Sequence, residues 1–291
     1  MNRSDISIII PAYNESATIG DIIRKIKSLY PEPEVIVIND GSSDDTVSAA
    51  KEAGAIVYSH PYNIGNGAAI KSGIRIASGE ILVFMDGDGQ HNPEDIGRML
   101  DFFPEYDMVV GARSKGDQVS LFRGIGNSVL NRLAGYVAKC RVHDLTSGFR
   151  AIKTEIAYNL LYLLPNTYSY PTTMTLSVLR GGRSLKYVPI NIQKRKNGVS
   201  HIKLSRDGVR FLMIITKICA LHSPLRIFLP ISALLFVSGL FRYLYTYITE
   251  GRFTNMSALL FSTSIIIFMM GLVSEQITQM RFERSEGQKE K

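Results

Sequence analysis

A stretch without a single charged residue, 254–274, is the feature that most restricts how this chain can fold. About 20 apolar residues are enough for a helix to cross the hydrocarbon core of a bilayer. A second stretch, 227–241, is also free of charge, and the tyrosines that follow it suit a membrane interface. We therefore expect two transmembrane helices joined by a short loop. The alternative, a buried helical hairpin of a soluble domain, would need a much larger core.

The basic residues around these stretches predict the orientation of the chain in a membrane. Lysines and arginines precede the first stretch and follow the second, where they are Arg281, Arg284, Lys289 and Lys291. Such an excess marks the cytoplasmic side, so we expect both termini in the cytoplasm of a prokaryote and the protein in its plasma membrane. Basic and apolar residues also mix over 203–224, as in an amphipathic juxtamembrane helix. The net charge of +7 is therefore explained by binding to anionic membrane lipids and not by binding to nucleic acid.

The first two hundred residues have a different pattern, that of an α/β domain. Short runs of β-branched and apolar residues alternate with stretches of helical spacing. The runs lie at 6–10, 35–38, 55–58, 81–85 and 108–110. This alternation is typical of a mostly parallel sheet wrapped by helices. We expect four parts, namely the α/β domain at 1–202, the juxtamembrane helix at 203–224, the transmembrane hairpin at 225–280 and a cytoplasmic tail at 281–291.

Polar residues gather at the ends of three predicted strands. Asn14 and Glu15 follow the first run, Asp40 follows the second, and Asp86 and Asp88 follow the fourth. A strand-to-helix turn with an N-cap would explain any one of them taken singly. Since ligands of such sheets bind beyond the carboxyl ends of the strands, we expect these side chains around one crevice.

The segment Asp-Gly-Asp-Gly-Gln at 86–90 carries the strongest chemical signal. Two carboxylates two residues apart offer hard oxygen ligands to Mg²⁺ or Mn²⁺, and the glycines allow a phosphate to approach the backbone. A divalent ion there would neutralise a leaving diphosphate. The alternative for this motif alone is a solvated Asp/Gly turn.

Together, residues 11–15, residues 40–42 and the Asp86/Asp88 pair resemble the family-two glycosyltransferases of the GT-A fold. The likeness extends in motif order over residues 5–202 and is greatest to the dolichyl-phosphate mannose and polyprenyl-phosphate glucose synthases. It implies a GT-A, Rossmann-like domain with metal-dependent, inverting chemistry. The implied reaction moves a single hexose, mannose or glucose, from a nucleotide diphosphate sugar to dolichyl or undecaprenyl phosphate at the cytoplasmic membrane face.

The resemblance also implies roles for individual residues on the donor side. The residues that would line the nucleoside pocket are Pro11, Tyr13 and Glu15. Asp40 would hydrogen-bond the base, and Asp86 would lie near the ribose and the metal. Asp88 and Gln90 would be the direct ligands of Mg²⁺ or Mn²⁺. We expect the adjacent His91 to support this site without being a ligand, because Asp and Gln suffice for ligation.

On the acceptor side, the resemblance implies a cationic site for the lipid phosphate. The residues that would form or border it are Arg113, Arg123, Asn127, Ser128 and Ser147, together with Arg195 before the membrane segments. Asp88, Arg113, Arg123 and Arg195 would carry the catalytic roles. The chain departs from the family pattern in two places, because Asn127 stands where a serine is expected and His201 replaces a lysine.

Two other functions remain open at this point. A processive polysaccharide synthase of the same fold is one, although such enzymes carry a Gln-x-x-Arg-Trp element and this chain has no tryptophan. A catalytically silent membrane scaffold is the other. The sequence is compatible with a homo-oligomer. The loop 63–67 with Lys71 lacks the spacing of a phosphate-binding P-loop, so we expect it to have a structural role.

Overall fold

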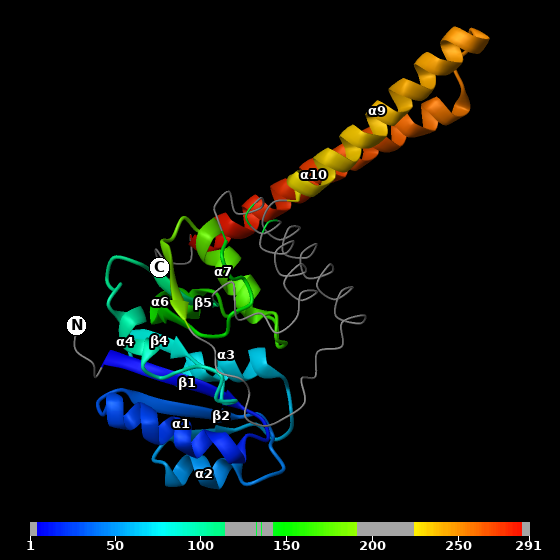
Figure 1. The fold of residues 1–291 in the computed structure, drawn as a ribbon. Coiled ribbons are helices and arrows are strands. Elements are labelled where there is room, and N and C mark those ends of the chain that lie inside the picture. Colours follow the sequence, from blue (N-terminus) through cyan, green and yellow to red (C-terminus); the bar gives the residue numbers. More distant parts are fainter. Residues whose placement is uncertain (1–4, 114–131, 133–134, 136–141, 191–223, 287–291) are drawn as a thin grey trace. The chain divides into compact units, whose positions relative to one another are not determined.

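A computed structural model describes residues 5–113, 132, 135, 142–190 and 224–286 (Figure 1). The chain divides into two compact units, Met1–Lys203 and Leu204–Lys291, and each is described by itself. The expected amphipathic helix at 203–224 lies outside the described residues, apart from its last position. The four expected part boundaries stay predictions.

The first unit is built on one seven-stranded sheet in the order β3-β2-β1-β4-β6-β5-β7. Its strands are β1 (Ile6–Ala12), β2 (Glu34–Asn39), β3 (Ile56–Ser59), β4 (Ile81–Phe84), β5 (Met108–Arg113), β6 (Arg150–Lys153) and β7 (Leu185–Ile190). Strands β3, β2, β1 and β4 run parallel, β6 runs antiparallel to β4 and β5, and β7 runs parallel to β5. The prediction of a mostly parallel α/β sheet is confirmed.

Helices cover both faces of this sheet, as Figure 1 shows. They are α1 (Ser16–Leu29), α2 (Thr46–Glu52), α3 (Asn66–Ile76), α4 (Asp95–Leu100), α6 (Thr154–Asn159) and α7 (Tyr170–Arg180). Along β1, Ile8 and Ile10 join the core beneath α1 and α4, whereas Ile9 joins the core beneath α3 and α7. Because strand side chains alternate between the two faces, a strand covered on both sides must be apolar throughout, as β1 is.

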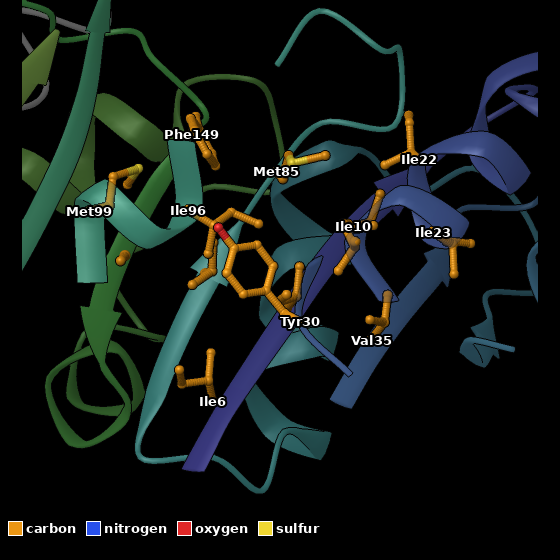
Figure 2. Close-up of a cluster of buried hydrophobic side chains, with 14 of the residues drawn as sticks. Ile6, Ile10, Ile22, Ile23, Tyr30, Val35, Met85, Ile96, Met99 and Phe149 are labelled. Atoms are coloured by element: carbon orange, nitrogen blue, oxygen red, sulfur yellow. The ribbon is translucent and has the colours of Figure 1, made fainter. Parts of the chain in front are cut away.

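Tyr30 packs into the core between β1, α1 and α4. Its ring lies among Ile6, Ile10 and Ile96 in Figure 2. Its hydroxyl accepts a hydrogen bond from the Gly97 amide at 2.9 Å, so the polar end of the ring is paired inside this core. This packing holds the start of β1 and the helix after β4 in fixed relation. Strand β1 leads into the loop with Asn14 and Glu15, and α4 follows the loop with Asp86 and Asp88.

Strand β6 was not predicted from the sequence. Arg150 begins it and is completely buried, between β4 and β5 in the sheet. A four-residue strand with a charged residue at each end has no alternating apolar pattern, so its sequence contains no local strand signal. Its insertion changes the sheet from parallel to mixed on one side of the crevice.

The second unit is a helical hairpin of α9 (Leu225–Glu250) and α10 (Asn255–Glu286). Both helices are long and apolar enough to cross a membrane, and only 11% and 17% of their most apolar windows are buried. A core helix of a soluble domain would be mostly buried, so the alternative of a soluble hairpin is disfavoured. Gly251 ends α9 in the left-handed conformation, with φ of 64° and its amide bonded to the Tyr247 carbonyl. Helix α10 continues to Glu286, into the segment expected to form the tail.

Small residues bring the two helices of the hairpin close together. Ser232 and Ser264 each donate a hydroxyl hydrogen bond of 2.9 Å to the backbone carbonyl of the other. A Cβ atom added to Gly271 would lie 2.7 Å from the Phe228 Cβ atom, which shows that only glycine fits there. Small residues and interhelical hydrogen bonds are typical of helix pairs in membranes.

Candidate active site

Three loops meet at the carboxyl ends of β1, β2 and β4, which are neighbours in the sheet. The first two are tied to each other. The Asn14 amide donates to the Ser42 hydroxyl at 3.0 Å, and the Asn14 side-chain oxygen accepts from the Ser43 amide at 2.9 Å. The Glu15 amide donates to the Thr46 hydroxyl at 2.9 Å. Asn14 has φ of 56°, a left-handed conformation that asparagine tolerates better than most residues. The two predicted loops are therefore tied together on one side of the expected crevice, and we call this side its first wall.

The third loop carries the acidic motif, and it is anchored to α1. The Thr18 hydroxyl donates a buried hydrogen bond of 2.8 Å to the Gly87 carbonyl. The Gln90 amide donates to the Asp88 carboxylate at 3.1 Å, so the loop curls around this carboxylate. Asp86, Asp88 and Gln90 are half-buried, and the contact of Thr18 with Gly87 brings them to the wall formed by the first two loops.

These three side chains fit a divalent cation in the chemistry of their donor atoms. Two carboxylates and one amide present the hard oxygen ligands that Mg²⁺ and Mn²⁺ prefer. Among the described residues, no group of three or more His, Cys, Asp or Glu side chains is placed to hold a metal ion. A site here would therefore depend on the Gln90 amide and on oxygens of the substrate, in addition to the two aspartates.

His91 is buried directly behind this loop. Its ring stacks on Phe149, with ring centres 5.1 Å apart and planes at 21°. Burial lowers the pKa of His91 to about 4, although the nearby Asp88 carboxylate opposes this shift, so the imidazole is neutral near pH 7. Its Nδ1 atom has no hydrogen-bond partner among the described residues. The ring supports the acidic loop by packing, in line with the role predicted for it.

The opposite wall is the segment 144–149, which leads into β6. Asp144 is its centre. The Arg113 guanidinium donates to this carboxylate through Nε at 2.8 Å and Nη2 at 3.0 Å. The amides of Thr146 and Ser147 donate to Asp144 as well, each at 3.1 Å. Burial alone would raise the pKa of the Asp144 carboxyl, but the hydrogen bonds and the charge of Arg113 lower it below its ordinary value. Asp144 is therefore an ionised anchor for this segment.

Arg113 thus has a more complex position than the sequence predicts. We expected its guanidinium to hold an acceptor phosphate, yet two of its nitrogens hold Asp144, and Nη2 also bonds the Thr146 hydroxyl. Burial opposes its charge, but Asp144 raises the pKa of Arg113 above its ordinary value. Arg113 therefore remains charged, and it orients the segment that carries Ser147.

Ser147 and Arg150 complete this wall. The Ser147 hydroxyl is buried and has no hydrogen-bond partner among the described residues. The Arg150 guanidinium bonds the Ser147 carbonyl, and it donates to the Pro171 carbonyl at 2.8 Å and the Thr175 hydroxyl at 3.3 Å. Burial lowers the pKa of Arg150, although the guanidinium stays charged at neutral pH. Two arginines therefore hold this segment: Arg150 bonds the Ser147 carbonyl, and Arg113 bonds the Asp144 carboxylate.

Gly148 lies in the run 144–150, which resembles the acceptor-side loop of the family, and the sequence does not predict which residue it approaches. A Cβ atom at this residue would lie 2.7 Å from the Asp86 carboxylate oxygen Oδ2. The acidic loop and the segment 144–149 therefore touch at Asp86 and Gly148. A glycine in Ser-Gly-Phe-Arg indicates that another group comes close to the backbone, but only the tertiary structure shows that this group is Asp86.

Asp40 has a different environment from the one expected. The family resemblance assigns it to the nucleotide base, yet it is buried and both of its carboxylate oxygens have partners. It accepts hydrogen bonds from the amides of Ile64 at 3.0 Å and Gly65 at 2.8 Å, and His60 Nδ1 lies 2.7 Å away. In this structure Asp40 organises the loop before α3.

That loop has the structural role that we expected for 63–67. The amides of Gly67 and Ala68 donate to the Asn166 carbonyl at 3.0 and 3.3 Å, so the start of α3 is occupied by protein. A Cβ atom at Gly67 would lie 2.1 Å from the Pro165 carbonyl oxygen. The glycine is needed because two backbone segments touch there.

Some of the remaining predicted site residues lie in the described part of the chain, and the others lie outside it. Pro11 lies inside β1 and is buried, whereas Tyr13 is 46% exposed in the loop after it. Arg123, Asn127, Ser128 and Arg195 lie outside the described residues. The predicted acceptor site is therefore described only through Arg113 and Ser147.

Replacement of Asp144 by asparagine should destabilise the protein by about 2–3 kcal/mol. Breaking a fully buried ion pair costs about 3–5 kcal/mol, and the Arg113 side chain is 32% exposed, which reduces the loss. Thermal unfolding of the purified variant measures this effect. Asp21→Asn is the control, because its ion pair with Arg24 is solvent-exposed, and it should leave the unfolding temperature unchanged.

The same ion pair sets a pH dependence. The folded-state pKa of Asp144 is depressed, so its stabilising contribution is present above the unfolded-state pKa and is lost as the pH falls through the folded-state value. The stability difference between the parent protein and Asp144→Asn should therefore be constant near neutral pH and shrink in acid. A difference that grew on acidification would contradict the assignment.

Solved structures similar to this chain identify its fold. Glucosyl-3-phosphoglycerate synthase from Mycobacterium tuberculosis, in complex with Mn²⁺, UDP and glucosyl-3-phosphoglycerate, matches with a TM-score of 0.60 at 22% identity. The match covers 74% of this chain and 78% of that one. The mixed sheet with acidic strand ends thus has the GT-A fold, which confirms the fold class predicted from the sequence.

Family profiles narrow this class. The glycosyl transferase family 2 profile matches residues 7–161, and the GtrB C-terminal hairpin profile matches residues 223–280. Because the first match spans more than half of the chain, the protein belongs to glycosyl transferase family 2. The family resemblance drawn from the strand-end motifs is confirmed, and α9 and α10 lie within the residues that match the hairpin profile.

Two curated relatives extend the comparison. CsbB, a putative glycosyltransferase of Bacillus subtilis (strain 168), is 28% identical over an alignment of 308 positions that covers 97% of this chain and 89% of the relative. Polyprenol monophosphomannose synthase of Mycolicibacterium smegmatis is 29% identical over 222 positions, which cover 71% of this chain and 83% of the relative.

Proposed function

We propose that this glycosyltransferase moves a single hexose, mannose or glucose, from a nucleotide diphosphate sugar to a polyprenyl phosphate. One observation carries the proposal, namely that a family 2 catalytic domain and a GtrB C-terminal hairpin occur in one chain. The hairpin would keep the domain at a bilayer, where a polyprenyl phosphate resides. The relative named polyprenol monophosphomannose synthase supports this substrate class. The proposed location is the cytoplasmic face of a prokaryotic plasma membrane.

The donor would bind in the crevice between the tied loops and the acidic loop. Pro11, Tyr13 and Glu15 would border the nucleoside, and Asp86 would lie near the ribose. Asp40 would contribute by holding the loop at 64–65, because its carboxylate already has three partners. A carboxylate can accept about four hydrogen bonds, so the contact of Asp40 with the base that the resemblance implies stays a prediction.

Asp88, Gln90 and Asp86 would hold Mg²⁺ or Mn²⁺ in this crevice. When bound, the cation would neutralise the diphosphate that leaves as the bond to the sugar breaks. The protein's own contribution is to fix these oxygens. Thr18 anchors the loop, His91 packs behind it, and Gly148 allows the Asp86 carboxylate to sit against the opposite wall.

The acceptor needs little activation in this proposal. A phosphate oxygen is already anionic near neutral pH, so no strong general base is required. Positive charge from Arg123 and Arg195 would offset the repulsion between two anionic substrates. Arg113, whose charge Asp144 offsets, would hold the segment that presents the Ser147 hydroxyl, which has no hydrogen-bond partner among the described residues. Attack from the face opposite the leaving group inverts the anomeric carbon, so an α-linked donor should give a β-linked lipid.

The experiment that tests the function is a screen of nucleotide sugars against undecaprenyl and dolichyl phosphate. The purified full chain is incubated with each pair, and lipid-linked products are identified by mass. The expected result is a product with one hexose per lipid. A ladder of longer products would identify a processive synthase, and metal-dependent donor hydrolysis without any lipid product would reject the proposed acceptor.

Arg123→Ala should lower transfer efficiency about tenfold to a hundredfold, because it removes one charge-assisted contact worth about 1.5–3 kcal/mol. Nucleotide affinity should barely change, since this arginine would not touch the donor. Measuring both quantities on the same preparation separates the roles. Equal loss of both would assign Arg123 to the donor, and loss of neither would return it to the protein surface.

A further inference from the structure

The segment between Glu155 and Arg180 contains no charged residue, and it belongs to the catalytic unit. Most of α7 within it is buried, so its apolar character is largely explained by the core. Three tyrosines are not explained in this way. Tyr158 is 58% exposed, Tyr162 is 66% exposed and Tyr168 is 78% exposed. We call these three side chains the tyrosine surface.

The tyrosine surface has a composition that suits one kind of partner. Tyr158 lies on α6, Tyr162 lies one turn further along, and Tyr168 lies in the loop before α7. A tyrosine combines an apolar ring with a polar hydroxyl, and it is enriched where protein meets the headgroup region of a bilayer. The three tyrosines carry no charge, whereas nucleic acid and acidic proteins are recognised through basic side chains.

The chain itself brings a bilayer to this unit. Helices α9 and α10 can span a membrane, and they are covalently linked to the catalytic unit. Covalent linkage gives the bilayer surface a high effective concentration, so weak contacts by a few aromatic side chains are sufficient for docking. We infer that the tyrosine surface rests on the lipid headgroup region of the membrane that holds α9 and α10.

The place of this surface in the fold agrees with that partner. The loop that carries Tyr168 packs on the start of α3, where the Gly67 amide bonds the Asn166 carbonyl at 3.0 Å. Lys71 on α3 donates to the Leu164 carbonyl at 3.3 Å. Since α3 begins beyond the carboxyl end of β3, Tyr168 lies at the same edge of the sheet as the crevice.

Contact of Tyr168 with lipid beside the crevice would shorten the path of a membrane-bound acceptor to the site. The phosphate of such an acceptor stays at the bilayer surface while its chain remains in the hydrocarbon. This step alone rests on the proposed function. The tyrosines, their exposure and the tether do not depend on it.

The absence of tryptophan from the sequence allows a direct test. Tyr162→Trp introduces a single indole into the tyrosine surface of the full chain. Ile56→Trp is the control, because Ile56 is 55% exposed and lies at the start of β3, at the opposite edge of the sheet from the crevice. Both variants are reconstituted into phosphatidylcholine–phosphatidylglycerol vesicles, with and without brominated acyl chains, which quench nearby indoles.

The indole at position 162 should lose most of its emission in brominated vesicles, and the indole at position 56 should keep it. Equal emission from position 162 in brominated and plain vesicles would overturn the inference. Protection of position 162 from a water-soluble quencher, without any effect of bromine, would do the same by showing that a second copy of the chain covers it.

A second measurement links the surface to turnover. The triple variant Tyr158→Ser, Tyr162→Ser and Tyr168→Ser should raise the KM for vesicle-embedded polyprenyl phosphate severalfold and leave nucleotide affinity unchanged. An unchanged KM in an active enzyme would contradict a role in docking. If no polyprenyl phosphate is a substrate at all, the quenching result still decides whether the surface contacts lipid, so the two proposals fail separately.

Discussion

Asp88→Ala should abolish sugar transfer, and EDTA should abolish it in the parent protein. Asp88 belongs to the acidic loop whose oxygens suit Mg²⁺ or Mn²⁺, and the described residues contain no alternative group of three His, Cys, Asp or Glu side chains. Loss of one preorganised electrostatic contact typically costs about a hundredfold to a thousandfold in rate, and loss of the cation itself should cost more. Transfer is measured by lipid-linked product.

The controls for this prediction distinguish metal loss from damage to the fold. Asp21→Ala removes an exposed carboxylate of α1, and its activity should equal that of the parent. Excess Mg²⁺ or Mn²⁺ should restore the EDTA-treated parent but not Asp88→Ala. If Asp88→Ala and the chelated parent both transferred sugar at the parental rate, the proposed metal site would be wrong.

Gly148→Ala should reduce transfer about a hundredfold or more. The new Cβ atom would lie 2.7 Å from the Asp86 Oδ2 atom, which is closer than real Cβ contacts come, so the carboxylate or the segment 144–149 must move. A displacement of about 1 Å in a positioning group can cost about a hundredfold in rate. Steady-state transfer and nucleotide affinity should both be measured, because Asp86 is proposed to lie near the ribose.

The matched control is Gly20→Ala, inside α1. Its new Cβ atom would meet the end of the flexible Arg24 side chain at 3.3 Å, and alanine favours helix. We expect activity and unfolding temperature close to those of the parent. Full activity of Gly148→Ala would show that Asp86 tolerates displacement and does not depend on this contact.

The two walls of the crevice have opposite electrostatic character. One wall carries Asp86 and Asp88, while the other carries the Arg113–Asp144 ion pair above the buried Arg150. Because Asp144 offsets the charge of Arg113, the net positive charge of the described second wall comes from Arg150, which does not reach solvent. The proposed attraction of a phosphate acceptor therefore depends on further arginines, which is why Arg123 and Arg195 are informative positions to mutate.

Much of this protein follows from its sequence alone. Strands β1 to β5, helix α1 and the two long apolar helices have recognisable patterns within a single segment, and local patterns need no partner to be recognised. The acidic strand ends share one edge because parallel strands align their carboxyl ends. The family resemblance rests on these same segments, so the amino-acid sequence is sufficient to predict both the fold and the family.

The tertiary structure decided how the second wall is built. Arg113 and Asp144, and likewise Asp86 and Gly148, are far apart in the sequence, and no periodicity links either pair. Arg150 would be expected at the surface from its charge, yet it is buried because backbone carbonyls and a hydroxyl accept its hydrogen bonds. Such partners are brought together only when β6 inserts between β4 and β5, and strand order is set by the packing of the whole domain, not by any one segment.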